Sequence, residues 1–166
     1  MELVNTAVDP DTLTCTEQVE AWWTAHRYSG RHDRDATELA ALRAIRPELR
    51  TLLTSDRDRA AEIANAMLAQ ERAVPQLVRH DGLDWHIHAI SPDAPLDRRV
   101  IVESAMAMVD LIRADELTRL SVCADDSCDG LVLDLSRNRS RRFCSSSCGN
   151  RNAVAAYRAR QAAGGS

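Results

Sequence analysis

Four of the five cysteines lie close together in the C-terminal part of the chain, in two pairs that could hold a metal ion. The first pair is Cys123 and Cys128, and the second pair, Cys144 and Cys148, follows after fifteen residues. Two close pairs separated by an insert of this length are typical of a structural zinc site. Four thiolates can surround Zn(II) tetrahedrally at about 2.3 Å and leave no position for water. The spacing therefore predicts a closed Zn(II) site formed by all four residues.

Two disulfide bonds are the alternative use of the same four cysteines. Disulfides belong to oxidising compartments, and the N-terminal sequence MELVNTAVDPDTLTC has neither the basic leader nor the apolar core of a signal peptide. We therefore expect a cytoplasmic protein and favour zinc over disulfides. No stretch approaches the roughly 18 apolar residues that a membrane span needs, so membrane insertion is disfavoured as well. Cys15 stands alone and is expected to be a small packed residue rather than a ligand.

Charge is divided unequally along the chain. All 21 basic residues are arginines, and together with 25 acidic residues they give a net charge of -4. From residue 137 to the end there are seven arginines and no acidic residue, a charge of +7. Residues 1–136 carry the other 14 arginines and all 25 acids, a charge of -11. A basic segment after an acidic body indicates a polyanionic partner, and a merely solvated basic tail is the simpler alternative.

The insert between the two cysteine pairs has a pattern of its own. Leu131, Leu133 and Leu135 recur at every second position, which predicts a strand. Residues 137–140 are a candidate polar turn, and residues 141–143 could return as a second strand. The sequence becomes helical after the second cysteine pair, and the order of knuckle, hairpin and helix resembles a treble-clef finger. About forty residues bury too little apolar area to fold alone, so metal binding should be coupled to folding.

Helical periodicity predominates in the first 120 residues. Pro47 is expected to break or restart one of the predicted helices, and a long helix is predicted over about residues 96–114. An Asp-Gly pair at residues 81–82 lies between two β-like runs, which predicts a hairpin near residues 76–90. The chain is therefore expected to be mostly α with small β-hairpins (α+β).

Two histidines, His86 and His88, fall on one face of the second predicted strand of that hairpin, opposite Trp85 and Ile87. They could bind a metal or a ligand. Alternation alone also predicts polar residues on a solvated strand face, and we favour that interpretation. The chain has no Gly-rich phosphate loop and no HExxH motif, and a closed four-cysteine site offers no open position to a substrate. An enzyme is therefore not expected.

Two motifs resemble a known combination of domains. Residues 136–144, SRNRSRRFC, and Cys148-Gly149-Asn150-Arg151 resemble the CGNR zinc-finger family of bacterial proteins, over about residues 123–160. The N-terminal Leu3-Val-Asn-Thr6 resembles the start of the ABATE domain, which usually precedes that finger. Members of the family are regarded as stress-related transcriptional regulators. The resemblance implies four zinc-binding cysteines and a finger that contacts DNA.

The length and composition suit this organisation. The chain has 166 residues, of which 45% are hydrophobic and 28% charged, as in folded globular proteins. Residues 1–120 are expected to form the ABATE-like, mainly helical domain, and residues 121–162 the treble-clef-like CGNR finger. Residues 163–166 are expected to be a disordered tail. The acidic domain would sense a ligand or oligomerise, with a homodimer as one arrangement, but the sequence identifies no small-molecule effector.

The expected function is DNA binding by a bacterial transcriptional regulator with one Zn(II) cofactor, located in the cytoplasm with the nucleoid. Arginines would meet phosphates, and Asn150, Arg151 and Arg158 are candidates for base edges, because Arg pairs with guanine and Asn with adenine. The candidate nucleic-acid-binding residues are Arg137, Asn138, Arg139, Arg141, Arg142, Asn150, Arg151, Arg158 and Arg160. The alternative is a zinc-stabilised module for protein–protein interaction or for RNA binding, since the fold alone does not decide function.

Overall fold

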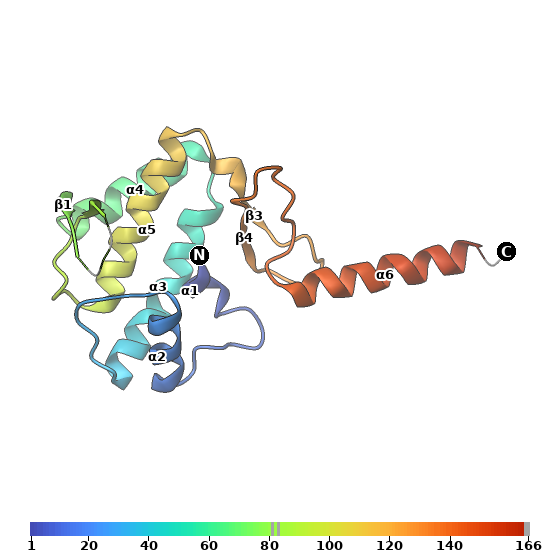
Figure 1. The fold of residues 1–166 in the computed structure, drawn as a ribbon, viewed down its shortest axis with the longest axis horizontal. Helices are drawn as coiled ribbons and strands as arrows, with labels where there is room; N and C mark the ends of the chain where they lie inside the picture. The colour runs from blue at the N-terminus through green and yellow to red at the C-terminus, as the bar shows by residue number, and fades with distance from the viewer. Residues whose placement is uncertain (81, 83, 165–166) are drawn as a thin grey trace.

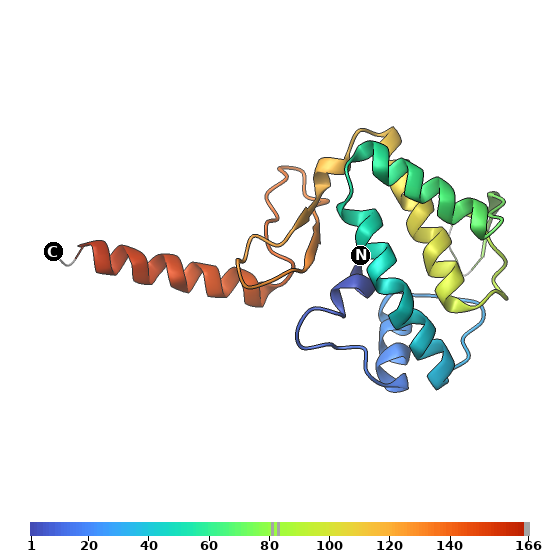
Figure 2. The same cartoon turned by 180° about the vertical axis from the view of Figure 1, so that it is seen from behind.

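The chain forms a helical body, a small two-stranded unit beside it, and one long helix that projects from that unit (Figures 1 and 2). The computed structural model describes residues 1–80, 82 and 84–164. The expected fold class, mostly α with two small antiparallel hairpins, is confirmed. The elements are α1 Glu2–Asn5, α2 Thr16–Ala25, α3 Ala36–Thr54, α4 Arg57–Gln70, β1 Gln76–Val78, β2 His86–His88, α5 Leu96–Arg113, the 3-10 turn η1 Leu117–Arg119, β3 Leu120–Val122, β4 Leu131–Leu133 and α6 Ser146–Gly164.

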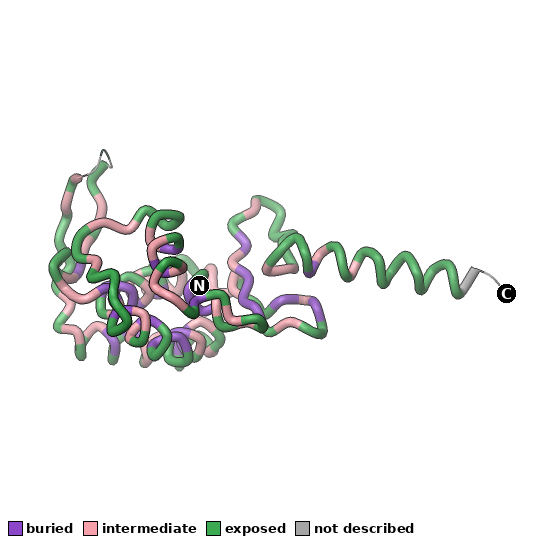
Figure 3. The backbone as a smooth tube through the Cα atoms, turned by 90° about the horizontal axis from the view of Figure 1, so that it is seen from below, coloured by how far each residue is buried: buried purple, intermediate pink, exposed green. Residues whose placement is uncertain are grey.

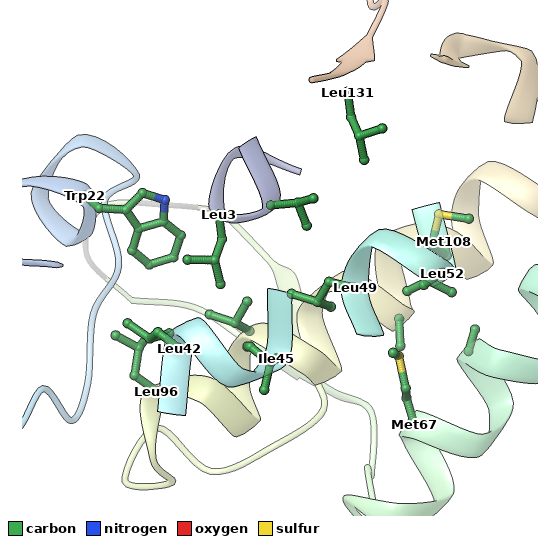
Figure 4. Close-up of a cluster of buried hydrophobic side chains, with 14 of the residues drawn as sticks. Leu3, Trp22, Leu42, Ile45, Leu49, Leu52, Met67, Leu96, Met108 and Leu131 are labelled. Atoms are coloured by element: carbon green, nitrogen blue, oxygen red, sulfur yellow. The ribbon is translucent and has the colours of Figure 1, made fainter. Parts of the chain in front are cut away.

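Helix α3 organises the core of the body. Its buried residues Leu42, Ile45, Leu49 and Leu52 recur at three- and four-residue spacing and form one apolar stripe (Figure 4). Helix α5 packs against both α3 and α4, while α1 and α2 pack against α3. Asp35 is the N-cap of helix α3, and its carboxylate accepts a hydrogen bond from the backbone N–H of Glu38.

Pro47 lies inside helix α3 without interrupting it, so the prediction of a break or restart at this residue is wrong. A proline in a helix interior removes one hydrogen bond and costs about 3 kcal/mol. Ile45 before it and Leu49 after it are both buried in the same core, and Pro47 itself faces solvent. Packing on both sides of the proline therefore holds the helix continuous.

The first hairpin agrees with the prediction from the sequence. Strand β1 pairs antiparallel with β2, with Gln76 opposite His88 and Val78 opposite His86, as predicted near residues 76–90. The predicted long helix is also confirmed as α5, Leu96–Arg113. Asp81 of the predicted Asp-Gly turn lies outside the described residues, and Gly82 has a positive φ of 74°.

The second hairpin differs from the prediction. Strand β4 pairs with β3, Leu120–Val122, and not with residues 141–143, which form no strand. Both carboxylate oxygens of the buried Asp134 accept backbone hydrogen bonds, from Ser136 at 2.8 Å and from Arg141 at 2.8 Å. These bonds fold the chain into a turn directly after β4. The chain therefore cannot return alongside β4, and the preceding segment pairs with β4 instead.

A pair of hydrogen bonds joins the two-stranded unit to the body. The side-chain amide of Asn5 donates to the carbonyl of Leu131 at 2.9 Å, and its oxygen accepts from the N–H of Leu131 at 2.7 Å. The amide thus pairs with β4 as a neighbouring strand would. The Leu131 side chain is 2% exposed and points toward the core cluster, to which Leu3 also belongs (Figure 4). The unit that carries the cysteines therefore shares the core of the body.

A second link fixes the irregular segment between α1 and α2. Arg46 of α3 is nearly buried and makes two hydrogen bonds to the Asp11 carboxylate, from Nη1 at 2.9 Å and from Nη2 at 2.8 Å. Arg46 Nη1 also donates to the hydroxyl of Thr6 at 3.1 Å. The bonds from Arg46 lower the pKa of Asp11 to about 2.

This ion pair predicts a pH dependence of stability. The pKa of Asp11 lies below its ordinary value of 3.8, so the stabilisation is complete above about pH 4 and is lost as the pH falls towards about 2. We expect Asp11→Asn to lower the free energy of unfolding by about 2 kcal/mol at neutral pH, with little difference from wild type near pH 2. Urea denaturation over a pH series measures this. Asp93→Asn, at an exposed carboxylate, is the control, and an equal loss from Asp11→Asn at every pH would contradict the prediction.

Candidate metal centre and basic finger

The four cysteines of the two predicted pairs come together in the two-stranded unit. Their sulfur atoms all lie within 4.8 Å of one another, and none of the cysteines forms a disulfide. Cys123 directly follows β3, and Cys128 precedes β4. Cys144 lies just before α6, and Cys148 lies in its first turn. The first cysteine pair lies between the two strands of the hairpin and not before it, whereas the second pair lies at the start of the helix, as predicted. We call residues 119–161 the finger from here on.

The distances between the sulfurs suit Zn(II). The sulfur of Cys144 is 3.5 Å from that of Cys128 and 3.7 Å from that of Cys148. Ligands at about 2.3 Å from a tetrahedral zinc ion stand about 3.8 Å apart, whereas the sulfurs of a disulfide are about 2.05 Å apart. The disulfide alternative is therefore absent, and the donor set fits the Zn(II) cofactor of a closed structural site.

Several hydrogen-bond donors point at the sulfurs. The backbone N–H of Gly130 donates to the sulfur of Cys128 at 3.4 Å, and the N–H of Cys144 donates to that of Cys123 at 3.4 Å. The guanidinium of Arg151 donates to the sulfur of Cys148 at 3.2 Å. Such donors stabilise the negative charge that four thiolates carry around a divalent ion.

Metal binding by the centre depends on the pKa values of its thiols. Burial raises the pKa of Cys144 to about 12 and also raises that of Cys128. The hydroxyl of Ser145, which donates to the sulfur of Cys148 at 3.3 Å, lowers the pKa of Cys148. Metal ligation requires thiolates. The free energy of binding Zn(II) must therefore offset the cost of deprotonating Cys144 and Cys128, whose pKa values are raised.

Gly130 is a feature of the centre that the spacing of cysteines did not identify. A Cβ atom at this position would lie 2.7 Å from the sulfur of Cys144 and 3.3 Å from that of Cys128. The backbone therefore approaches the sulfurs so closely that only glycine fits. The signal available in the sequence is a glycine two residues after the second cysteine of the first pair.

Arg151 of the CGNR motif ties the two cysteine pairs together. Its Nε and Nη2 lie 3.0 Å and 2.9 Å from Oδ2 of Asp125, a residue of the first knuckle. Asp125 is 5% exposed and also accepts hydrogen bonds from the N–H and hydroxyl of Ser127. These bonds lower the pKa of Asp125, with those from Ser127 contributing most. Arg151 thus connects the N-terminal part of α6 to the opposite side of the centre.

The remaining candidate arginines differ in how far their charge is already paired. The side chain of Arg139, which has a positive φ of 48°, lies 2.6 Å from Glu116 and donates to Thr118 at 2.9 Å. Arg141 donates to the carbonyls of Phe143 and Cys144, at 3.5 Å and 3.3 Å. Arg142 lies over the ring of Phe143, with 6.0 Å to its centroid. Among the described residues, no carboxylate pairs with Arg137, Arg142, Arg158 or Arg160.

The candidate residues fall on two exposed parts of the finger. Arg137, Asn138, Arg139, Arg141 and Arg142 lie in or next to the turn that Asp134 holds after β4. Asn150, Arg151 and Arg158 line a shallow groove at the start of α6, together with Asp125 and Asp126 of the first knuckle. Arg160 is exposed further along α6.

Helix α6 is exposed along nearly all of its length (Figure 3). It has 19 residues, and at 1.5 Å per residue it is about 28 Å long. It points away from the body and carries three arginines and no acidic residue. It extends to Gly164 and so includes the first two residues of the tail that was expected to be disordered, while residues 165–166 lie outside the described residues.

Three further positions bear on the sequence predictions. Cys15 lies at the N-cap of α2, distant in sequence from the cysteine centre, and is not part of it. His86 and His88 are half-buried and meet His80, which the sequence analysis did not single out.

Among the described residues, none of the helices combines the length and hydropathy required to cross a bilayer.

Comparison with known proteins identifies both parts of the chain. The family model of ABATE, described as “Putative stress-induced transcription regulator”, matches residues 1–115. The model of the CGNR zinc finger matches residues 119–161. Both families are of regulator or zinc-finger type, and neither is an enzyme family. A search of curated proteins finds no match.

The cysteine centre leads to a prediction about metal content. Cys144→Ser should lower the zinc content by about one ion per chain and unfold the finger, since four ligands are needed to close the site. The helical body should stay folded but lose about 1.5–3 kcal/mol of stability, because Leu131 leaves its core. Elemental analysis and thermal unfolding of the purified proteins measure both effects.

Cys15→Ser is the matched control, because it removes a thiol outside the centre and serine remains a good N-cap. This variant should keep the zinc content of the wild type. Equal zinc in the wild type and in Cys144→Ser would contradict the assignment of the centre.

Proposed function

The chain belongs to the ABATE family and carries a CGNR zinc finger, and from this membership we propose that it is a regulator that binds double-stranded DNA through the finger, of which most of helix α6 is part. The observation that carries the proposal is the set of exposed arginines without carboxylate partners. Arg137 and Arg142 lie at the turn, and Arg158 and Arg160 lie on the projecting helix. Exposed guanidinium groups without carboxylate partners are available to phosphates and to guanine bases.

The shape of the finger supports this proposal. The major groove of B-form DNA is about 12 Å wide and admits an α-helix. Helix α6 is exposed on nearly all sides and projects from the body, so a duplex can reach it without displacing other elements (Figures 1 and 3). Zn(II) would fix the first turn of the helix relative to the arginine-rich turn. Two separate basic segments would then meet one duplex in a defined geometry.

The charge distribution would direct the duplex to the finger. The net charge is +7 from residue 137 onwards and -11 before it. The body would repel phosphates, and the repulsion would be screened beyond about 8 Å at physiological ionic strength. Contact with DNA would therefore be confined to the projecting part of the molecule. Such a regulator would act in the cytoplasm, on the nucleoid.

The structure suggests a division of roles among the candidate residues. We assign phosphate contacts to Arg137, Asn138 and Arg142, which are exposed at the turn. We assign base-edge contacts to Asn150 and Arg158, with Arg160 on either bases or phosphates. Arg139, Arg141 and Arg151 hold the turn and the metal centre, and their contact with DNA would require them to keep or exchange those bonds.

Binding of a second protein chain is the other candidate function. Val154 and Tyr157 of α6 are 48% and 57% exposed and lie three residues apart on the helix. An apolar pair on a projecting helix suits a partner helix, and a second copy of this chain would make a homodimer. RNA remains the alternative polyanion, because phosphate contacts do not distinguish it from DNA.

The proposal predicts salt-dependent binding. Titration of a fluorescent DNA duplex at several salt concentrations should give affinities that fall steeply, with a slope of about -0.9 per phosphate contacted. Arg142→Ala should weaken binding to all duplexes and reduce the magnitude of the slope by about 1, whereas Arg158→Ala should also relax sequence preference.

Arg113→Ala is the matched control, because Arg113 is an exposed arginine at the end of α5 in the body. It should leave both affinity and slope unchanged. Absence of salt-dependent binding to any duplex would contradict DNA binding. Tighter binding to an RNA of the same sequence, or sedimentation as a dimer that Tyr157→Ala abolishes, would favour the alternatives.

A further inference from the structure

Three histidines converge at the end of the body that carries the β1–β2 hairpin. The Nε2 atom of His86 lies 3.1 Å from that of His88 and 3.2 Å from that of His80. The Nε2 atoms of His80 and His88 are 3.4 Å apart. The rings meet edge-on, with centroids 4.7–4.9 Å apart and interplanar angles of 65–89°. Three ring nitrogens from three residues thus point at one common position.

The register of the hairpin produces this convergence. His86 and His88 occupy alternate positions of β2 and therefore lie on the same face of the strand. Val78 of β1 pairs with His86, and His80 follows two residues later, in the segment after the strand. The same alternation brings His80 to the face that carries the other two rings. The face is half-buried rather than fully solvated, which the simpler interpretation of these histidines did not anticipate.

The hydrogen bond of His86 fixes the tautomer of its neutral ring. Its Nδ1 lies 2.7 Å from the carbonyl oxygen of Asp84. A carbonyl only accepts, so Nδ1 carries the proton, and in the neutral ring Nε2 presents a lone pair to the common position. A backbone carbonyl is one of the usual partners of the far nitrogen in a histidine that ligates a metal.

Hydrogen bonds among the three rings leave a conflict between their Nε2 atoms. If His80 and His88 both donate to His86, their own Nε2 protons face each other across 3.4 Å. If they do not donate, the lone pairs of two or three nitrogens face one another instead. A cation at the common position relieves both conflicts, because every nitrogen can then direct its lone pair at the ion.

The distances match those between nitrogen ligands of a transition metal. Zinc–nitrogen bonds are about 2.0–2.1 Å long, so two ligands of a tetrahedral ion stand about 3.3–3.4 Å apart. The separations of 3.1, 3.2 and 3.4 Å are close to that spacing. Imidazole nitrogen suits Zn(II), Co(II), Ni(II) and Cu(II), whereas Mg(II) and Ca(II) prefer oxygen ligands.

From this geometry we propose that His80, His86 and His88 bind a divalent transition-metal ion, as a second metal site distinct from the four-cysteine centre. The site lies at the end of the body remote from the finger (Figure 1). Three protein ligands leave the fourth tetrahedral position open, in contrast to the closed sulfur site.

A cavity adjoins the proposed site. All three histidines line a hollow of about 830 Å³, whose other walls include Tyr28, Arg99 and Glu103. Arg99 is 4% exposed and donates to the carbonyls of Ser29 and Arg31, which fixes one wall of the cavity. A water molecule or small anion in the cavity could complete the coordination of the ion.

Metal stoichiometry tests the site. Tag-free full-length protein that retains the zinc of its finger is titrated with Zn(II) by calorimetry, and elemental analysis follows after gel filtration. We expect one further equivalent per chain in the wild type. His86→Ala and His88→Ala should each weaken that binding at least about 10–100-fold, because changing even an outer partner of a metal ligand has an effect of this size. The finger zinc should stay unchanged in both variants.

The matched control is His26→Ala. His26 lines the same cavity, but its Nδ1 bonds to the carbonyl of Trp22 at 2.7 Å and it does not belong to the cluster. This variant should bind the second equivalent like the wild type. Titration with Co(II) gives an independent readout, since a nitrogen site should produce ligand-field bands without thiolate-to-cobalt charge transfer.

The outcomes separate this proposal from DNA binding. Saturation at one zinc per chain, or equal binding by wild type and His86→Ala, would overturn the histidine site and leave the proposed function untouched. Binding only at millimolar zinc, as ordinary exposed histidines show, would overturn it as well. If circular dichroism shows that His86→Ala is unfolded, His80→Ala, outside the strands, decides in its place.

Discussion

Four sulfur atoms within 4.8 Å of one another are the constraint on which the C-terminal part of the molecule depends. Thiolates this close repel one another, and the neighbouring structure is arranged to offset that repulsion. Gly130 brings a backbone N–H to one sulfur and Arg151 brings a guanidinium to another. The same Arg151 binds the buried Asp125, so the N-terminal part of α6 is fixed to the first knuckle. The contacts that stabilise the metal centre thus also set the direction of the projecting helix α6.

The arginines of the finger serve two purposes that the sequence alone does not separate. A run of arginines predicts a basic surface, but it does not show which guanidinium groups are already paired. Arg139 and Arg151 have carboxylate partners in Glu116 and Asp125. These acids lie more than twenty residues from their arginines, so only the tertiary structure reveals the pairing. The effective positive surface of the finger is therefore smaller than its formal charge and is concentrated at Arg137, Arg142 and the outer turns of α6.

Local patterns predicted what local forces determine. The cysteine spacing, the long helix at residues 96–113 and the hairpin at residues 76–88 each depend on residues close in sequence, and all were predictable. The errors arise where another interaction outweighs the local pattern. Pro47 stays helical because core packing outweighs a local preference, and β4 pairs with β3 because Asp134 turns the chain after the strand. The histidine cluster was missed because His80 lies outside any regular element, so that no periodicity links it to β2.

The bond between Asn5 and Leu131 has a consequence for how signals could pass through the molecule. The side chain of Leu131 helps to fill the interior of the helical body, while its main chain belongs to the strand that leads from one cysteine pair to the other. A change in the stability of the finger must then change the stability of the helical body, and thermodynamic linkage makes that influence mutual. An excised finger peptide would expose the side chain of Leu131 and would lack the Asn5 amide that pairs with the N–H and the carbonyl of Leu131. It would therefore be a poor surrogate for the same segment in the intact chain.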